Sequence, residues 1–146
     1  MMRVKIAALE DFDEGFALIQ KFHSRTPYYP SCPLEKDKIR KILEETFTDP
    51  TSSIVLLAVD KEKFVGILVG VARELSFSSK RVSCELMWFS DDPRALIYLW
   101  RTYEYWAKEV AKVDIFSGGS YSPSVDKFLE GNKMVAVERS FLKELN

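Results

Sequence analysis

The chain has 146 residues, 47% of them hydrophobic and 29% charged, and this composition predicts one folded domain over residues 1–146. Its formal net charge is -1 and its 21 basic residues form no cluster, which argues against a nucleic-acid partner. No stretch approaches the roughly 18 consecutive apolar residues of a membrane span, so no membrane partner is expected. Cys32 and Cys84 lie far apart, and we expect free thiols in a cytoplasmic protein rather than a disulfide.

Hydrophobic periodicity and turn residues predict ten elements along the chain. In chain order they are a strand over 4–8, helices over 11–22 and 34–47, strands over 53–59, 64–75 and 81–89, a long helix over 93–112, a strand over 113–116, a short helix over 122–131 and a final strand over 134–145. The short polar link 60–63 is typical of a β-hairpin. Gly66 and Gly70, inside the strand that follows, indicate a bulge or a close backbone approach.

The segment 81–112 is central because one strand runs directly into one long helix. Strand alternation places Glu85 beside Met87 and Phe89 on one face, with Trp88 on the other. Both faces are largely apolar, which predicts a central strand that is covered on both sides.

The junction between this strand and this helix has a pattern suited to binding an anion. Asp92 is a good N-cap residue, and Pro93 suits the first helical position. A strand that ends at a helix N-terminus leaves backbone N–H groups at its carboxyl end, where α/β folds commonly hold anionic ligands.

The order of the elements predicts an α+β fold. Three consecutive strands form an antiparallel meander, and the long helix then crosses over to a strand that should lie parallel to strand 81–89. We therefore expect a mixed, mostly antiparallel, twisted sheet of six to seven strands flanked by about four helices.

Two segments give the chain a resemblance to the GCN5-related N-acetyltransferase (GNAT) family. The first runs from Glu85 to a Trp-Ala-Lys-Glu turn at 106–109, and the second, 127–145, ends in Lys-Glu-Leu. The resemblance covers essentially the whole chain. It implies transfer of acetyl from acetyl-coenzyme A to an amine by direct attack, without a metal. The acceptor would be a small-molecule or peptide amine, and a homodimer is left open.

The resemblance also implies a coenzyme site. Backbone groups of two strand residues would line the pantetheine, and N–H groups of the loop opening the long helix would hold the diphosphate. The cofactor-binding residues implied in this way are Met87, Phe89, Asp92, Arg94, Ala95, Leu96 and Ser122. The family's loop glycines are absent from 91–96, and Asp91 and Asp92 occupy that stretch. An alternative is therefore a binding or interaction module of the same fold that has lost coenzyme binding and catalysis.

Glu85 is the candidate general base, because the family often carries a glutamate on this strand. The alternative is a structural ion pair with Arg73 or Arg81 across the hairpin. The family's acid is often a tyrosine on the closing helix; here those positions are Phe128 and Leu129, so Tyr121 is the candidate acid. The candidate substrate-binding residues, in the loop 23–33, are Tyr28 and Tyr29.

Overall fold

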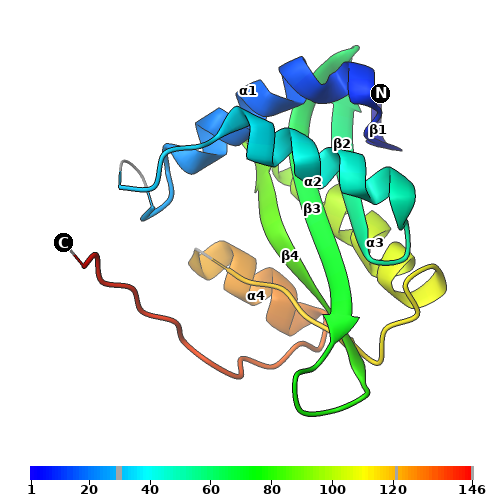
Figure 1. Cartoon of the computed structure of the whole chain (residues 1–146), viewed down its shortest axis with the longest axis vertical. Helices are drawn as coiled ribbons and strands as arrows, with labels where there is room; N and C mark the ends of the chain where they lie inside the picture. The colour runs from blue at the N-terminus through cyan, green and yellow to red at the C-terminus, as the bar shows by residue number, and fades with distance from the viewer. Residues whose placement is uncertain (29–30, 121, 146) are drawn as a thin grey trace.

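The computed structural model describes residues 1–28, 31–120 and 122–145, which form one twisted sheet with helices on both faces (Figure 1). The strands are β1 (Met2–Ile6), β2 (Ser53–Asp60), β3 (Lys63–Glu74), β4 (Arg81–Ser90) and β5 (Ile115–Phe116). The helices are a short 3-10 turn (Leu9–Asp11), α1 (Phe12–His23), α2 (Lys36–Thr48), α3 (Pro93–Glu109) and α4 (Pro123–Gly131). Within these residues no helix is both long and apolar enough to cross a membrane.

The strands lie in the order β1-β2-β3-β4-β5, so neighbours in space are also neighbours in sequence. The pairs from β1 to β4 are antiparallel, whereas β5 lies parallel to β4. The parallel pair is possible because α3 crosses over between these two strands. The predicted meander and the predicted parallel pair are both confirmed.

The core has two halves, one on each face of the sheet. α1 and α2 lie across one face and α3 lies behind the other (Figure 1). Val55 and Leu57 of β2 pack in the half under α1 and α2, whereas Leu56 and Ala58 pack in the half under α3. Because both faces are covered, β2 appears in the sequence as a continuous apolar run rather than as an alternating one.

A bulge in β4 changes the faces that the sequence predicts. Val69 pairs with Met87, but the next residue, Gly70, pairs with Glu85, so Leu86 is an extra residue in β4. A Cβ on Gly70 would lie 2.9 Å from the ring of Tyr103 in α3, so Gly70 and its partner Glu85 face α3.

The prediction that Glu85 shares a face with Met87 and Phe89 is therefore wrong. Met87 and Phe89 belong to the core half under α1 and α2. Trp88 packs in the half under α3, on the same side as Glu85. One extra residue is enough for this reversal, because side chains alternate with a period of two along a strand.

Within the described residues the sheet has five strands, not the six to seven that the sequence predicts. The strand expected over 134–145 does not form within the described residues. Its first residue, Met134, instead donates its N–H to the carbonyl of Leu129 at 3.1 Å, which belongs to the end of α4. The chain then continues as an extended segment outside the sheet (Figure 1).

Candidate active site

The two parallel strands separate soon after they pair. β4 and β5 share only the pairs Val82 with Ile115 and Ser83 with Phe116, and the N–H of Ser117 then donates to the carbonyl of Ser83 at 3.1 Å. Gly118 follows, packed so closely on the indole of Trp100 that an added Cβ would lie 2.3 Å from it. A side chain at this position would therefore push the loop off the core and widen the separation.

A cavity of about 310 Å³ lies where the strands have separated. Four elements surround it: β4, the end of α1, the first turn of α3 and the start of α4 with its preceding loop. The residues that line it are Phe22, Arg25, Thr26, Glu85, Trp88, Phe89, Ser90, Leu96, Gly119, Ser120, Ser122 and Val125. The cavity lies at the carboxyl ends of neighbouring parallel strands, where ligands commonly bind in open α/β sheets.

Glu85 is the acidic side chain in this lining. The N–H of Gly119 donates a hydrogen bond to Glu85 Oε1 and so links β4 to the loop after β5. Burial raises the pKa of Glu85 to about 7, and the Gly119 hydrogen bond offsets only part of that effect. A carboxyl group with this pKa is populated in both protonation states near neutral pH.

The alternative explanation of Glu85 as an ion-pair partner is wrong. Glu85, Arg73 and Arg81 all lie in the described part of the chain, and no ion pair joins the glutamate to either arginine. Arg81 instead donates to the carbonyl of Thr51 at 3.1 Å. The hairpin therefore supplies no cation to balance the Glu85 charge.

The raised pKa of Glu85 predicts a stability difference that depends on pH. The unfolded glutamate ionises near 4.5 and the folded one near 7, so the native protein binds the extra proton in between and loses stability as pH rises through this window. Glu85→Gln removes this loss and keeps an acceptor for Gly119. Relative to wild type, the variant should gain up to about 3 kcal/mol in free energy of unfolding between pH 4.5 and pH 8.

Urea denaturation of both proteins at the two pH values measures this difference. Glu74→Gln, at the exposed end of β3, is the matched control and should show no such gain. A Glu85→Gln variant that is less stable than wild type at pH 8 would contradict the assignment of Glu85 as an unpaired carboxylate.

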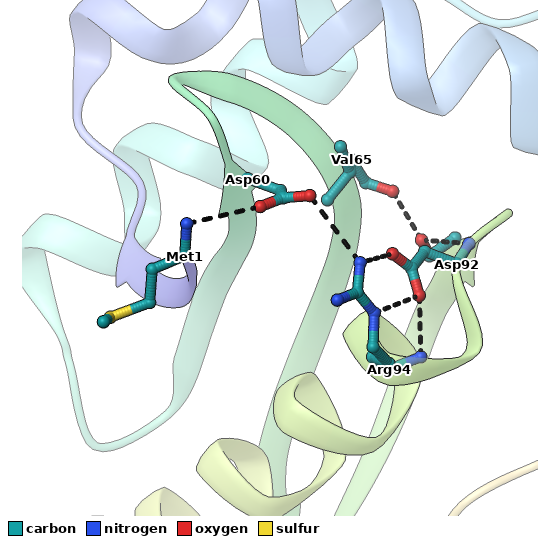
Figure 2. A network of polar contacts seen from close by, with 6 residues as sticks. Met1, Asp60, Val65, Asp92 and Arg94 are labelled. Carbon is teal, nitrogen blue, oxygen red and sulfur yellow. Dashed lines mark hydrogen bonds and ion pairs between the residues drawn. The ribbon is translucent and has the colours of Figure 1, made fainter.

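At the junction between β4 and α3, the backbone N–H groups donate hydrogen bonds to acceptors within the protein. The Asp92 carboxylate accepts the N–H of Arg94 at 2.9 Å and also binds the Arg94 guanidinium, at 2.7 Å from Nη2 (Figure 2). The N–H of Asp92 donates to Ser90 Oγ at 3.0 Å, and Pro93 has no N–H to offer. The N–H groups of Ala95 and Leu96 both donate to the Asp92 carbonyl. Every N–H from Asp92 to Leu96 is thus satisfied within the protein.

Charged side chains extend this network on both sides. Arg94 also lies 3.7 Å from Asp60, whose other oxygen lies 3.7 Å from the N-terminal amine (Figure 2). Asp91 binds Lys21 and also Arg25, the latter at 2.7 Å, and these two cations lower the pKa of Asp91. The Arg25 guanidinium also lies 5.4 Å from the centre of the Phe89 ring. These contacts could not be predicted from a local pattern, because Lys21 and Arg25 are far from Asp91 along the chain.

The other predicted site residues divide into three groups. Phe89, Leu96 and Ser122 line the cavity, and the Leu96 carbonyl accepts the Trp88 indole N–H at 3.0 Å. Met87 and Ala95 pack in the core and are not part of the lining, and Tyr28 is 49% exposed outside it. Tyr29 and Tyr121 lie outside the described residues.

Sequence reasoning missed much of the lining, including Phe22, Thr26 and Gly119. One available signal was the Gly-Gly-Ser loop at 118–120, which follows a strand predicted to be parallel to β4. The carboxyl end of such a strand is a common ligand site, so this loop could have been assigned to the cavity.

Comparisons with known proteins identify the fold. No protein-family model matches the chain, and no curated protein matches its sequence. Solved structures match nearly its full length. One is glucosamine-6-phosphate N-acetyltransferase from Arabidopsis thaliana, with a TM-score of 0.74 and 10% identity, over 100% of this chain and 99% of that one.

Two other matches are acetyltransferases from bacterial or environmental sources. An aminoglycoside acetyltransferase from an uncultured soil metagenomic sample, in complex with sisomicin, has a TM-score of 0.68 and 14% identity, over 99% of this chain and 95% of that one. Ribosomal-protein-alanine N-acetyltransferase from Brucella melitensis has a TM-score of 0.70 and 10% identity, over 99% of each chain. The fold is therefore GNAT-like, as the sequence resemblance implied.

Proposed function

We propose that the protein is an N-acetyltransferase that acts on an amine, with Glu85 as the general base. The observation that carries this proposal is the position of Glu85. It lines the cavity where β4 and β5 separate, it is held by the Gly119 N–H, and within the described residues it forms no ion pair with an arginine, since Arg25 in the same lining pairs with Asp91. The names of the structural neighbours support the reaction class, because an aminoglycoside, glucosamine 6-phosphate and a protein alanine all carry an amine.

The chemistry available to Glu85 follows from its surroundings. An amine arrives at neutral pH mostly as an ammonium ion and must lose a proton before it can attack a carbonyl carbon. A carboxylate with a pKa of about 7 can accept that proton and later release it to water. The Gly119 N–H fixes one carboxylate oxygen and leaves the other to face the amine. The aromatic rings of Phe22, Trp88 and Phe89 keep much of the surrounding wall apolar.

Acetyl-coenzyme A would supply the acetyl group as a thioester. The apolar gap between the two strands suits the acyl end of such a molecule. The start of α3 does not suit its diphosphate, because the N–H groups there are already bonded within the protein and Asp92 holds the Arg94 guanidinium. The gap between the strands therefore suits the acyl end of acetyl-coenzyme A, whereas the start of α3 does not suit its diphosphate.

This misfit supports a second candidate function, a GNAT-like binding module without coenzyme or catalysis. The specific observation in its favour is the Asp92 carboxylate, which bonds the Arg94 N–H and guanidinium that a diphosphate would use. In this case the cavity would bind a cationic or amine ligand against Glu85 without any acyl transfer.

Calorimetry with two acyl donors tests the proposed function. The donors are acetyl-coenzyme A and S-acetylpantetheine, which lacks the nucleotide and its phosphates. An acetyltransferase should bind both saturably, and because the N–H groups at the start of α3 are already bonded the two dissociation constants should differ by less than about tenfold. No binding of either donor at millimolar concentration would reject the enzyme and leave the binding module.

A further inference from the structure

The cavity beside β4 has one charge of each sign in its lining. Among the described residues that line it, Glu85 and Arg25 are the charged ones, and the others are apolar or carry a hydroxyl group. Arg25 pairs with Asp91, and no ion pair within the described residues joins it to Glu85. Two opposite charges that do not neutralise each other favour a ligand that carries both signs itself.

The Arg25 guanidinium is held in place but keeps donors for a ligand. It lies 5.4 Å from the centre of the Phe89 ring, and its Nη1 donates to Asp91 at 2.7 Å. A guanidinium has five N–H donors, and within the described residues this is the hydrogen bond that it makes. The side chain is 55% exposed, so the remaining donors are accessible. Phe89 and Asp91 thus orient a group whose other N–H donors remain available.

The surroundings of Arg25 keep a positive charge in spite of Asp91. Lys21 binds the same carboxylate, so two cations face one anion at this side of the cavity. The surplus charge attracts an anionic group. Because a guanidinium presents a planar fork of donors, a carboxylate is the anion whose geometry it matches well.

The two charges lie apart along β4. Glu85 pairs with Gly70 of β3, whereas Phe89, the ring beside the guanidinium, pairs with Ile67. Three residue steps of β3 separate these partners, which corresponds to about 10 Å along the strand. Trp88 lies between the two positions in β4 and adds its ring to the lining. An ammonium and a carboxylate on one carbon atom are too close together to reach both ends.

We propose that the acceptor is an amino acid whose amine and carboxylate lie at opposite ends of an apolar chain, with the amine at Glu85 and the carboxylate at Arg25. The inference rests on the proposed function, because it takes Glu85 as the residue that faces the amine. The amine nitrogen forms the new bond to the acetyl carbon, the thioester C–S bond breaks, and Glu85 accepts one amine proton. Arg25 takes no part in these steps and selects the substrate.

Calorimetry at pH 8, where Glu85 is mostly ionised, tests the pair of charges with three probes. They are ε-aminocaproate, hexylamine, which lacks the carboxylate, and norleucine, an isomer with both charged groups on one carbon. ε-Aminocaproate should bind about tenfold or more tightly than either of the others, the scale of a charge-assisted hydrogen bond. Arg25→Gln should remove this advantage and leave the affinity for hexylamine unchanged.

Arg40→Gln is the matched control. Arg40 also pairs with a carboxylate, Glu44, and lies 5.3 Å from the centre of a phenyl ring, that of Phe12, but it is on α2 and outside the lining. This variant should leave all three affinities unchanged. Equal affinity for ε-aminocaproate and hexylamine, tighter binding of norleucine, or no binding of ε-aminocaproate at millimolar concentration would overturn the proposal.

A coenzyme phosphate is the other source of an anion for Arg25. If Arg25→Gln weakens binding of acetyl-coenzyme A but not of S-acetylpantetheine, and leaves ε-aminocaproate unaffected, Arg25 serves the coenzyme and the proposal is wrong. Release of the coenzyme thiol separates this inference from the proposed function. Binding of ε-aminocaproate without thiol release would reject acetyl transfer and keep the two-charge site. Equal rates of transfer to hexylamine and ε-aminocaproate would support the enzyme and reject this acceptor class.

Discussion

Glu85→Gln is expected to lower turnover on an identified amine by about a hundredfold or more at neutral pH, the usual scale for loss of a general base. Glutamine has nearly the same shape and can still accept the Gly119 hydrogen bond, but it cannot take a proton from the ammonium group. The loss should therefore appear in kcat, while the affinity for the acyl donor stays close to that of wild type.

The pH profile separates this role from a structural one. Wild-type kcat/KM should rise as pH increases through about 7, because only the carboxylate form of Glu85 accepts a proton. The residual activity of Glu85→Gln should not show that rise. Glu74→Gln, with its exposed glutamate at the end of β3, should keep the wild-type rate and profile. Unchanged turnover in Glu85→Gln would remove Glu85 from the mechanism.

The elements themselves could be predicted from the sequence, because local patterns determine them. The β2–β3 hairpin, the cap at Asp92 and the crossover through α3 all depend on residues close together along the chain. Gly70 in β3 indicated a bulge or a close backbone approach, and the structure shows both, a register shift at Gly70 and a close approach to Tyr103. The β4 residues themselves carry no pattern that identifies Leu86 as the extra residue. That single extra residue moved Glu85 to the opposite face from the one expected.

The candidate site shows the same division. Glu85 stood out because a carboxylate inside an apolar strand needs a partner or a function. Its actual partner, the Gly119 N–H, lies 34 residues away in a loop whose path depends on the packing of Gly118 against Trp100. The pairing of Asp91 with Lys21 and Arg25 likewise joins parts of the chain that no local pattern connects.

Residues 134–145 show how a local pattern can predict an element that does not form within the described residues. Their alternating apolar side chains favour a strand, yet a strand also needs a neighbour to satisfy its backbone N–H and C=O groups. No neighbouring strand is present for residues 134–145 within the described chain. The apolar pattern alone therefore could not show whether these residues form a strand.

Asp92→Gly is expected to strengthen binding of acetyl-coenzyme A by about tenfold to a hundredfold, the scale of one or two charge-assisted hydrogen bonds. The substitution removes the carboxylate that binds the Arg94 N–H at 2.9 Å and its guanidinium at 2.7 Å. Both groups then become free for the coenzyme diphosphate at the start of α3, where the helix dipole also favours an anion. The lost cap should cost only a few tenths of a kcal/mol in free energy of unfolding, because glycine itself suits the N-cap.

The matched control is Asp92→Asn, which removes the charge but keeps a side-chain oxygen to cap the helix. If the free N–H matters, the glycine variant should bind acetyl-coenzyme A more tightly than the asparagine variant, and S-acetylpantetheine should not distinguish the two. Equal affinity in wild type, Asp92→Asn and Asp92→Gly would show that Asp92 does not block an anion site. A gain confined to Asp92→Gly would instead assign the loss of phosphate binding to the side-chain oxygen that occupies the Arg94 N–H, rather than to the charge of Asp92.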